Sequence, residues 1–424
     1  MDSRWMFDVM LLLRPGNLAG NVEVLMKAVR SLAREGVPEM TIPCDAIRGG
    51  DCGSLNDHPA FQKTLAAAQE KFLKAASRVK GAPKIRFGEP MKLSFVGEGA
   101  DPRLPFCGRA AEVFPRQVTG LARRLAAIGC RDVTLGLSGG LDSALALLVA
   151  VSAFDLLGLD AKKGVHVYTM PGFGTTKRTK SNAEKLCEGL GLKLETIDIT
   201  AACRQHFKDI SQSASRHDVV FENAQARERT QILMDKANQT GGIVLGTGDM
   251  SEIALGWCTY NGDHMSMFGV NAGVPKTAVR DVCKWWAGGV TDELRRARPG
   301  LGAAADAILD IVATPVSPEL LPAKRGKIAQ KTESAIGPYE LHDFFLWHFV
   351  AECEGRAEML KAAKKAFRGA YTAAEIAKWL DLFLARFFSQ SFKRNCAPDG
   401  VQVFPVYLAP NAWHMPSDIA RPAL

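Results

Sequence analysis

The spacing of apolar residues changes along the chain and divides it into regions. Residues 7–13 and 39–43 are short apolar-rich runs that predict strands. Between them the spacing is helical, with one apolar face made of Leu25, Ala28, Val29 and Leu32. We expect one incomplete α/β unit over residues 1–72, which is too small to be a whole domain of this class. From 73 to 116 glycines and prolines interrupt every pattern, so we assign these residues to a linker or extended arm.

Beyond residue 116 the pattern becomes regular. Short apolar runs at 133–137, 165–169, 194–199 and 243–245 are separated by stretches long enough for helices. Strands that alternate with helices predict a parallel sheet with helices on both faces. We expect this α/β core over residues 117–290, followed by a helical, aromatic-rich part over 291–424.

Composition narrows the classes of function. The chain has 424 residues, of which 47% are hydrophobic and 23% charged, and a net charge of +8 without a long basic run, so no nucleic-acid partner is expected. The apolar run near the start is too short for a membrane span, and Asp2 and Asp8 are unlike a secretory signal. Ten cysteines without a CxxC pair or zinc spacing favour reduced thiols in a cytoplasmic protein.

The sharpest local signal is the loop Ser138-Gly139-Gly140-Leu141-Asp142-Ser143, at the end of an apolar strand and the start of an apolar helix. Two glycines allow a tight turn in which backbone N–H groups and the helix N-terminus face a bound anion, and phosphate is the natural ligand. No Lys-Ser/Thr pair follows, so this is not the common P-loop. Because Asp142 would repel phosphate directly, the loop suggests a bridging Mg²⁺. A glycine pair at a strand end can also be an ordinary turn.

This loop resembles the signature of the ATP pyrophosphatases, which split ATP between its α- and β-phosphates and transfer AMP to an acceptor oxygen. Later blocks are similar, in order and spacing, to bacterial NAD synthetases: 168–176, 222–227, 245–252, 256–263, 274–277, 314–320, 337–345 and 388–394. The resemblance covers about residues 110–420. It implies the Rossmann-like adenine nucleotide alpha hydrolase fold and an ATP-dependent ligase that adenylates and then amidates deamido-NAD, with release of AMP and pyrophosphate.

The resemblance also implies roles for individual residues. An ATP site is implied at Ser138, Gly139, Gly140, Leu141, Asp142, Ser143 and Thr247. A Mg²⁺ pair is implied at Asp142 and Glu252, and a phosphate-facing lysine in a catalytic role at Lys276. Contacts to deamido-NAD are implied at Asn223, Arg227, Glu252, Trp257, Cys258, Thr259, Tyr260, Asp263 and Lys393. The family builds this site across a homodimer, so a homodimer or higher homo-oligomer is expected.

Each assignment has an ordinary structural alternative. Asn223 and Arg227 are four residues apart and would usually form a solvated helix face, while Lys393 would usually be a surface charge. Glu252 could simply favour a helix N-terminus, and Trp257 is more often a core residue than a ligand contact. The main functional alternative is a non-catalytic nucleotide-binding relative that regulates a full-length synthetase. A third option is another ATP pyrophosphatase that acts on a different acid.

The N-terminal unit resembles only the opening of the nitrilase-like glutaminase domain that these synthetases carry, through Gly16–Asn21, Ile42–Cys44, Cys52–Leu55 and His58–Phe61. That domain uses a Glu, Lys, Cys triad. This chain has Cys44 at the position of the Glu, and we find no match to the parts of the domain that supply the Lys and the Cys. We therefore expect ammonia as the direct nitrogen donor and no glutaminase activity in this chain. A separate glutaminase is a possible partner.

Overall fold

The protein is described by a computed structural model that forms two compact units, one of residues 1–94 with 123–129 and one of residues 95–122 with 130–424. The described residues are 13, 18–44, 46–47, 59–88, 95–175, 177–314, 320, 332–408, 412–413, 415–417, 419 and 421. The strand expected at 7–13 lies outside them except for Leu13. Each unit is considered by itself.

The first unit is a small two-layer structure of two parallel strands and two helices. Its elements are α2 (Leu18–Arg34), β1 (Glu39–Pro43), α3 (Pro59–Ala76) and β2 (Lys84–Gly88). The apolar face expected for α2 is buried, and it packs with β1 and with Phe72 of α3. Strand β1 pairs in parallel with β2, with Met40 opposite Ile85. The unit therefore extends to residue 88, beyond the boundary expected at 72, because α3 and β2 complete a core that α2 and β1 alone leave open.

The second unit contains the expected α/β core and the helical C-terminal part. Its first half begins with α4 (Ala110–Ile128), of which residues 123–128 are grouped with the first unit. It continues with β3 (Val133–Gly136), α5 (Leu141–Leu157), α6 (Ala161–Gly164), β4 (Val165–Thr169), α7 (Lys177–Gly189), β5 (Leu194–Thr196), α8 (Thr200–Asp209), α9 (Val219–Thr240) and β6 (Ile243–Gly246). Its second half comprises α10 (Met250–Leu255), β7 (Phe268–Gly269), α11 (Lys276–Gly288), α12 (Asp292–Ala297), α13 (Pro299–Val312), α14 (Thr332–Ile336), α15 (Tyr339–Val350), α16 (Arg356–Ala366), α17 (Ala373–Ser389) and α18 (Ser391–Arg394).

The sheet of this unit confirms the expected α/β class. Its strands are all parallel, in the order β5-β4-β3-β6-β7. The chain leaves β3 toward β4 on one side and returns to pair β6 on the other, so the strand order reverses at β3. In open parallel sheets ligands bind in the crevice beyond the carboxyl ends of the strands at such a reversal. The loop that begins at Ser138 follows β3 and lies at this point.

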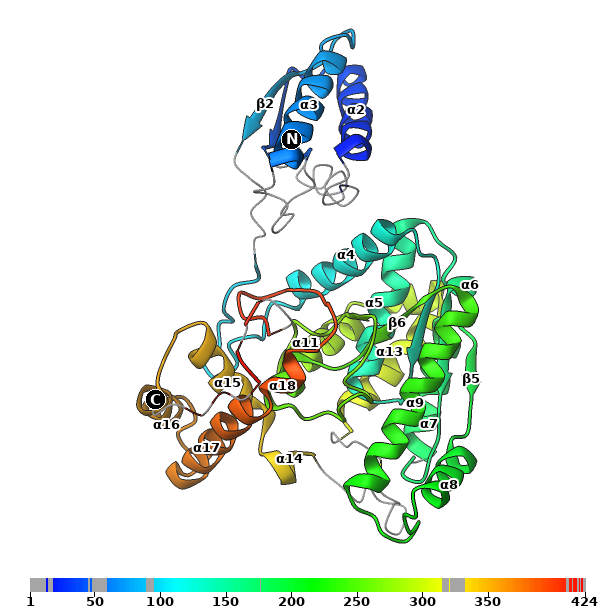
Figure 1. The fold of residues 1–424 in the computed structure, drawn as a ribbon, viewed down its shortest axis with the longest axis vertical. Helices are drawn as coiled ribbons and strands as arrows, with labels where there is room; N and C mark the ends of the chain where they lie inside the picture. Colours follow the sequence, from blue (N-terminus) through cyan, green and yellow to red (C-terminus); the bar gives the residue numbers. More distant parts are fainter. Residues whose placement is uncertain are drawn as a thin grey trace. The chain divides into compact units, whose positions relative to one another are not determined.

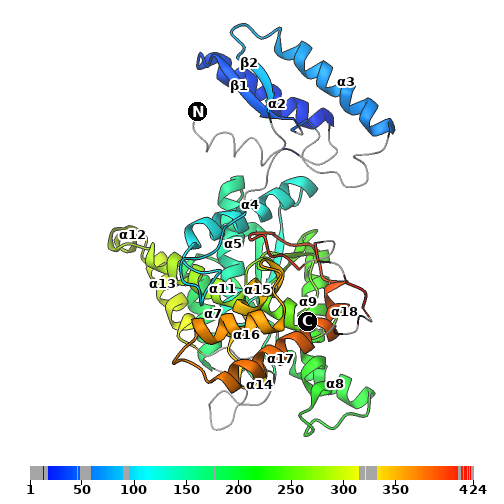
Figure 2. The same cartoon turned by 90° about the vertical axis from the view of Figure 1, so that its left-hand side faces the viewer.

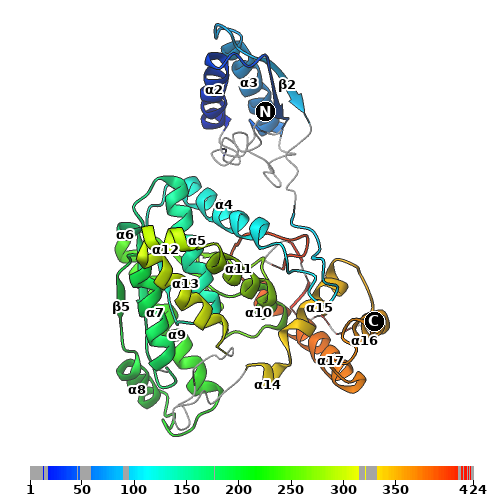
Figure 3. The same ribbon diagram turned by 180° about the vertical axis from the view of Figure 1, so that it is seen from behind.

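Helices cover both faces of the sheet. Helix α9 packs on β3 and β6, while α5 packs on β3 and α7 packs on β5, with α11 and α13 outside them. In Figure 1 α9 lies nearer the viewer than α13, and in Figure 3, which is seen from behind, α13 lies nearer. Helix α5 is apolar all round, and Leu145, Leu148 and Phe154 are almost completely buried. A helix with this composition belongs in the centre of a layer, where neighbours enclose every face.

The C-terminal helices form an aromatic-rich layer beside this core. Helices α15, α16 and α17 pack on one another, and Figure 2 shows them grouped together. Phe345 of α15 and Phe383 and Phe387 of α17 are fully buried. Helix α10, which follows β6, packs on both α15 and α17. None of the described helices combines the length and the apolar character that crossing a bilayer requires.

The segment expected to be a linker is partly built into the second unit. Residues 95–109 have no regular secondary structure, but the N–H of Val96 donates to the carbonyl of Val403 at 3.0 Å. The Phe106 ring is buried, with its centroid 5.2 Å from that of Trp347 and 5.0 Å from that of Phe404. Helix α4 then begins at Ala110 rather than near 117. Burial of these aromatic rings fixes this part of the arm without helix or strand periodicity.

Candidate active site

The Gly-rich loop closes on itself through its two serines. Ser143 lies in the first turn of α5, and its Oγ is 3.1 Å from the Oγ of Ser138. The N–H of Gly140 donates to the Oγ of Ser138 at 3.1 Å, and Gly140 is the N-cap of α5 without any side-chain cap. The uncapped first turn leaves backbone N–H groups that can bind an anion.

Gly139 is required at its position by both conformation and space. Its φ is +81°, which is in the left-handed region. A Cβ at this position would lie 2.1 Å from the carbonyl oxygen of Thr179. The loop therefore depends on this glycine for its close approach to α7.

The central feature of the site is a buried cluster of one lysine and three carboxylates. Lys276 is the first residue of α11, and its side chain is 2% exposed. Its Nζ lies 2.6 Å from Asp142 Oδ2, 2.9 Å from Glu252 Oε1 and 2.9 Å from Asp249 Oδ2. One oxygen from each of the three carboxylates lies within 4.8 Å of the others. Asp142 and Glu252, which the sequence places 110 positions apart, thus meet at one point.

The electrostatics of this cluster follow from burial and crowding. Burial raises the pKa of Glu252 to about 7 and raises the pKa of Asp249 well above its ordinary value, and in both cases neighbouring carboxylates add to the effect while Lys276 opposes it. Burial also opposes the charge of Lys276, but the carboxylates outweigh it and hold the pKa of its ammonium well above the ordinary value. Lys276 offers one positive charge to three carboxylates, so acidic groups are crowded at this point.

A buried asparagine joins the loop after β3 to the loop after β6. The Nδ2 of Asn271 donates to the carbonyl of Asp142 at 2.9 Å and to the carbonyl of Thr247 at 3.1 Å. Its Oδ1 accepts from Gln117 Nε2 at 2.9 Å, and both amide side chains are fully buried. Residues expected to contact ATP on two strands are therefore held together by one side chain.

Asp343 holds the start of α11 in a similar way. This buried residue of α15 accepts from Thr277 N at 2.9 Å, from Thr277 Oγ1 at 2.6 Å and from the Oγ of Ser251. Ser251 Oγ in turn accepts from the N–H of Lys276 at 2.8 Å. Burial raises the pKa of Asp343 to about 6. The aromatic-rich helical layer thus supports the lysine cluster through a single carboxylate.

The residues expected to contact deamido-NAD gather around the turn that follows α10. Thr259 Oγ1 donates to Asn223 Oδ1 at 2.8 Å, and Thr259 N donates to Asp263 Oδ1 at 2.8 Å. Arg227 Nε donates to the carbonyl of Tyr260 at 3.2 Å. The Arg386 guanidinium lies 5.2 Å above the ring of Trp257. Asn223 and Arg227, on α9, therefore support this turn rather than forming a purely solvated face.

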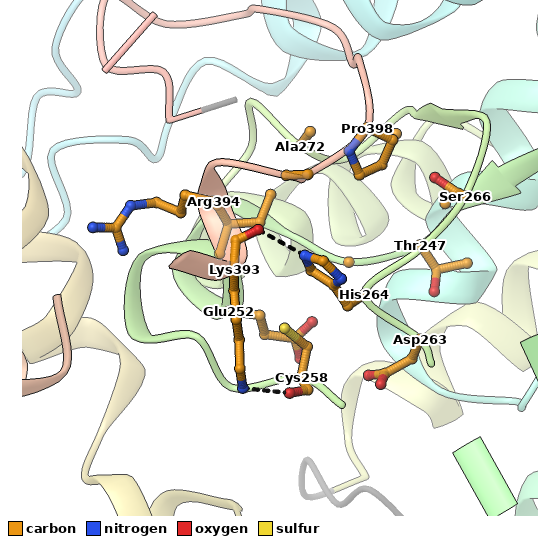
Figure 4. Close-up of a pocket in the computed structure, with 15 residues that line it drawn as sticks. Thr247, Glu252, Cys258, Asp263, His264, Ser266, Ala272, Lys393, Arg394 and Pro398 are labelled. Carbon is orange, nitrogen blue, oxygen red and sulfur yellow. Dashed lines mark hydrogen bonds between the residues drawn. The ribbon is translucent and has the colours of Figure 1, made fainter. Parts of the chain in front are cut away.

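A pocket opens between this turn and the C-terminal part of the unit. Figure 4 shows Glu252, Cys258, Asp263 and Lys393 on its wall, with Thr247 nearby. Lys393 Nζ donates to the carbonyls of Gly256 and Cys258 at 2.8 and 2.7 Å, and burial lowers its pKa. His264 Nε2 lies 2.7 Å from the carbonyl of Lys393. Lys393 is thus a half-buried group that braces the turn and also lines the pocket.

Three further residues of the site were not assigned from the sequence. Asp249 completes the carboxylate cluster, Asn271 joins two loops, and Asp343 holds the start of α11. Only Asp249 carries a local signal, because it precedes Glu252 by three residues and caps α10 by accepting from the Glu252 N–H at 2.8 Å. In addition, Lys276 was expected to face phosphate, whereas here its ammonium lies among the carboxylates.

Comparison with known proteins finds similarity to NAD synthases. The family model described as NAD synthase matches residues 113–303. Glutamine-dependent NAD(+) synthetase of Mycobacterium leprae (strain TN) is 39% identical over 334 residues, which are 73% of this chain and 48% of that protein. The protein of the same name from Mycobacterium tuberculosis (strain ATCC 25618 / H37Rv) is 39% identical over 336 residues, with the same shares. The chain spans about half the length of these relatives.

A solved structure shares the fold. The crystal structure of a glutamine-dependent NAD(+) synthetase from Cytophaga hutchinsonii superposes with a TM-score of 0.71, covering 95% of each chain at 13% identity. The matched segment contains the Gly-rich loop, the lysine and carboxylate cluster and the turn after α10. Residues 113–303 therefore resemble a domain of the NAD synthase family.

Proposed function

We propose that this protein is an amide-forming ligase that makes NAD from deamido-NAD, ATP and ammonia. The observation that carries this proposal is the meeting of the Ser138–Ser143 loop with Glu252 and Lys276 at the reversal point of the sheet. The family match of residues 113–303 and the names of the relatives support the choice of substrate.

The reaction needs an activation step because a carboxylate resists attack by ammonia. The nicotinate carboxylate attacks the α-phosphorus of ATP, forming an acyl adenylate and releasing pyrophosphate. Ammonia then adds to the acyl carbon, AMP leaves with the C–O bond electrons, and one proton is lost as the amide forms. No covalent bond to the protein is needed, so the chain's task is to bind, orient and neutralise charge.

The loop and the lysine supply that charge stabilisation. Backbone N–H groups at the uncapped start of α5 face the place where phosphate oxygens would lie. Lys276 provides a positive charge at the same edge of the sheet. Asn271 fixes the loop after β3 and the loop after β6 to each other through its two hydrogen bonds. Stabilisation of a departing anion by fixed donors of this kind typically contributes about 10²- to 10³-fold per donor.

The carboxylate cluster fits a divalent cation. Its ligands would be Asp142 and Glu252, with Asp249 as a third carboxylate, and hard carboxylate oxygens are the ligands that Mg²⁺ prefers. Asp142 Oδ1 is buried without a hydrogen-bond partner, and Asp249 Oδ2 approaches Lys276 without hydrogen-bond geometry. When bound, Mg²⁺ would neutralise charge on the phosphates and on the departing pyrophosphate.

The pocket beside Glu252 is our proposed site for the nicotinate end of deamido-NAD. It is lined by Cys258, Asp263 and Lys393, and its wall is the turn that Asn223 and Arg227 support. Its position next to the carboxylate cluster would bring the nicotinate carboxylate close to the phosphates of ATP. We also propose a homodimer in the cytoplasm, as the resemblance implies, and light scattering of the purified protein measures the oligomeric state.

Ammonia is proposed as the nitrogen donor because of the residue that the N-terminal unit has at the position of the glutaminase base. Where the resemblance places a glutamate base, this chain has the exposed thiol of Cys44 at the end of β1. A thiol, with an ordinary pKa of about 8.5 and one acceptor atom, does not replace a carboxylate base. The relatives are named glutamine-dependent, so a separate glutaminase that supplies ammonia to this chain remains part of the proposal.

A non-catalytic regulator is the second candidate, motivated by the incomplete glutaminase-like unit. The ligase releases AMP and pyrophosphate, and a non-catalytic regulator releases neither. Purified protein mixed with ATP, Mg²⁺, ammonium and deamido-NAD should release AMP and pyrophosphate in equal amounts with the NAD formed. Other acceptor acids should give no AMP. Binding of ATP without release of AMP in the complete mixture would favour the regulator instead.

A further inference from the structure

The ammonium of Lys276 occupies the place where a divalent cation would bind. Its Nζ is within 2.9 Å of one oxygen from each of Asp142, Asp249 and Glu252, and the side chain is 2% exposed. It donates hydrogen bonds to Asp142 Oδ2 and to Glu252 Oε1. These are the two carboxylates that the proposed function assigns to the metal.

Charge and space prevent a divalent cation from joining this arrangement unchanged. A cation coordinated by Asp142 and Glu252 needs the carboxylate oxygens that here accept hydrogen bonds from the Lys276 ammonium. A Lys276 Nζ left in place would put a second positive charge beside it in a buried environment, where like charges repel strongly. The ammonium of Lys276 and a divalent cation would therefore use the same carboxylate oxygens one at a time.

We propose that Lys276 is a tethered counter-ion of the metal site, so that its ammonium and a divalent cation bind among the carboxylates in competition. This inference rests on the proposed function. In this proposal the lysine lies among the carboxylates only while no phosphate is bound beside it. The phosphates of ATP supply the alternative partner to which the ammonium moves.

The backbone at Lys276 is held by contacts that do not involve its ammonium. The N–H of Lys276 is held by Ser251 Oγ at 2.8 Å, and the N–H of Thr277 is held by Asp343 at 2.9 Å. Among the described residues, the ammonium contacts the three carboxylates and lies 5.3 Å from the centre of the Tyr339 ring. Four rotatable side-chain bonds therefore suffice to redirect the charge.

A consequence is that divalent cation and nucleotide bind as a unit. Without nucleotide, the cation must displace an ammonium that has no other partner, so its affinity is weak. With ATP present, the phosphates accept the lysine and the carboxylates become free for the cation. This coupling protects the buried carboxylates from remaining unpaired in the free protein, a state that is strongly destabilising.

The test uses Mn²⁺ as the probe and needs no turnover. Lys276→Met removes the competitor and keeps the side-chain length, and the matched control is Lys284→Met, an exposed lysine two turns later on α11. Binding of Mn²⁺ is measured by electron paramagnetic resonance without nucleotide. Lys276→Met should bind Mn²⁺ about tenfold or more tightly than the wild type and the control. Equal affinities of all three proteins would overturn the inference.

A second measurement keeps the result decisive if Lys276→Met does not fold. The wild-type protein should show no rise in melting temperature with Mn²⁺ alone, within about 1 °C, and a clear rise when ATP is added with it. Lys276→Gln, which is also uncharged, should be stabilised by Mn²⁺ alone. Strong stabilisation of the wild type by Mn²⁺ without nucleotide would contradict the competition. Loss of NAD formation by the wild type would instead count against the proposed function, which these titrations do not measure.

Discussion

The two units of this molecule both contain parallel strands and helices that resemble a known enzyme domain, but they differ in what lies at the strand ends. In the second unit the loops after β3 and β6 bring Asp142, Glu252 and Lys276 to one point. In the first unit β1 is followed by the exposed Cys44, and the two-stranded sheet buries a core. The comparison teaches that similar α/β packing does not by itself bring reactive side chains to one point.

The largest effect is expected from the carboxylate in the Gly-rich loop. Asp142→Asn keeps the size of the side chain and removes its charge, so it should abolish NAD formation, a loss of about 10³-fold or more in kcat. Asp155→Asn changes an exposed aspartate of the same helix and should leave kcat unchanged. A steady-state assay of NAD formation by the two variants and the wild type measures this difference. Normal turnover by Asp142→Asn would remove this residue from the site.

The next effect concerns the pocket rather than the cluster. Lys393→Ala removes a charged group that lines the pocket and braces the turn after α10, so it should raise KM for deamido-NAD about 10- to 150-fold, which corresponds to about 1.5–3 kcal/mol. The KM for ATP should change much less. Lys364→Ala, on an exposed face of α16, serves as the control. Equal losses for both substrates would assign Lys393 to the fold or the dimer.

A smaller effect is expected in the pH dependence of stability. Burial raises the pKa of Glu252 from 4.5 to about 7, so the folded protein holds a proton there that the unfolded chain releases. The folded state therefore loses stability as pH rises between these values. Glutamine does not titrate, so Glu252→Gln should gain stability relative to the wild type from about pH 5 to about pH 8, by on the order of 1–3 kcal/mol.

Urea unfolding without divalent cations measures this difference at each pH. Glu358→Gln, an exposed position on α16, should keep a constant difference from the wild type over the same range. A constant difference for Glu252→Gln as well would mean that its pKa is not raised in the folded protein.

The smallest effect is expected in the first unit. Cys44→Ser should leave ammonium-dependent NAD formation within about twofold of the wild type, because the thiol is exposed and has no proposed part in the reaction. The same assay with glutamine tests whether the thiol has any role in nitrogen transfer. A large loss of NAD formation with either nitrogen source would show that the first unit also takes part in the reaction.

Local patterns were enough to predict the framework of the second unit. Strands β3 and β4 appear as apolar runs, and the loop after β3 is marked by glycines that its turn requires, so the sequence alone predicts a phosphate-binding loop at this place. Glu252 and Lys276 were assigned by resemblance, and the structure brings them together with Asp142.

The missed features depend on contacts between distant segments. Asn271 and Asp343 are buried polar residues whose partners lie far away in the sequence, so no local pattern indicates their roles. Strand β7 has only two residues, which is too short for any periodicity. The packing of Phe106 against Trp347 and Phe404 likewise could not be predicted from a segment interrupted by glycines and prolines.

The most direct test of the account supplies nitrogen in two forms. Purified protein is incubated with ATP, Mg²⁺ and deamido-NAD, with either ¹⁵N-labelled ammonium or glutamine labelled at its amide nitrogen, and the label in NAD is measured by mass spectrometry. We expect labelled NAD from ammonium, at a rate that rises with pH as free ammonia becomes available, and almost none from glutamine. Absence of NAD with ammonium would contradict the proposed ligase, and equally efficient labelling from glutamine without a partner protein would contradict ammonia as the direct donor.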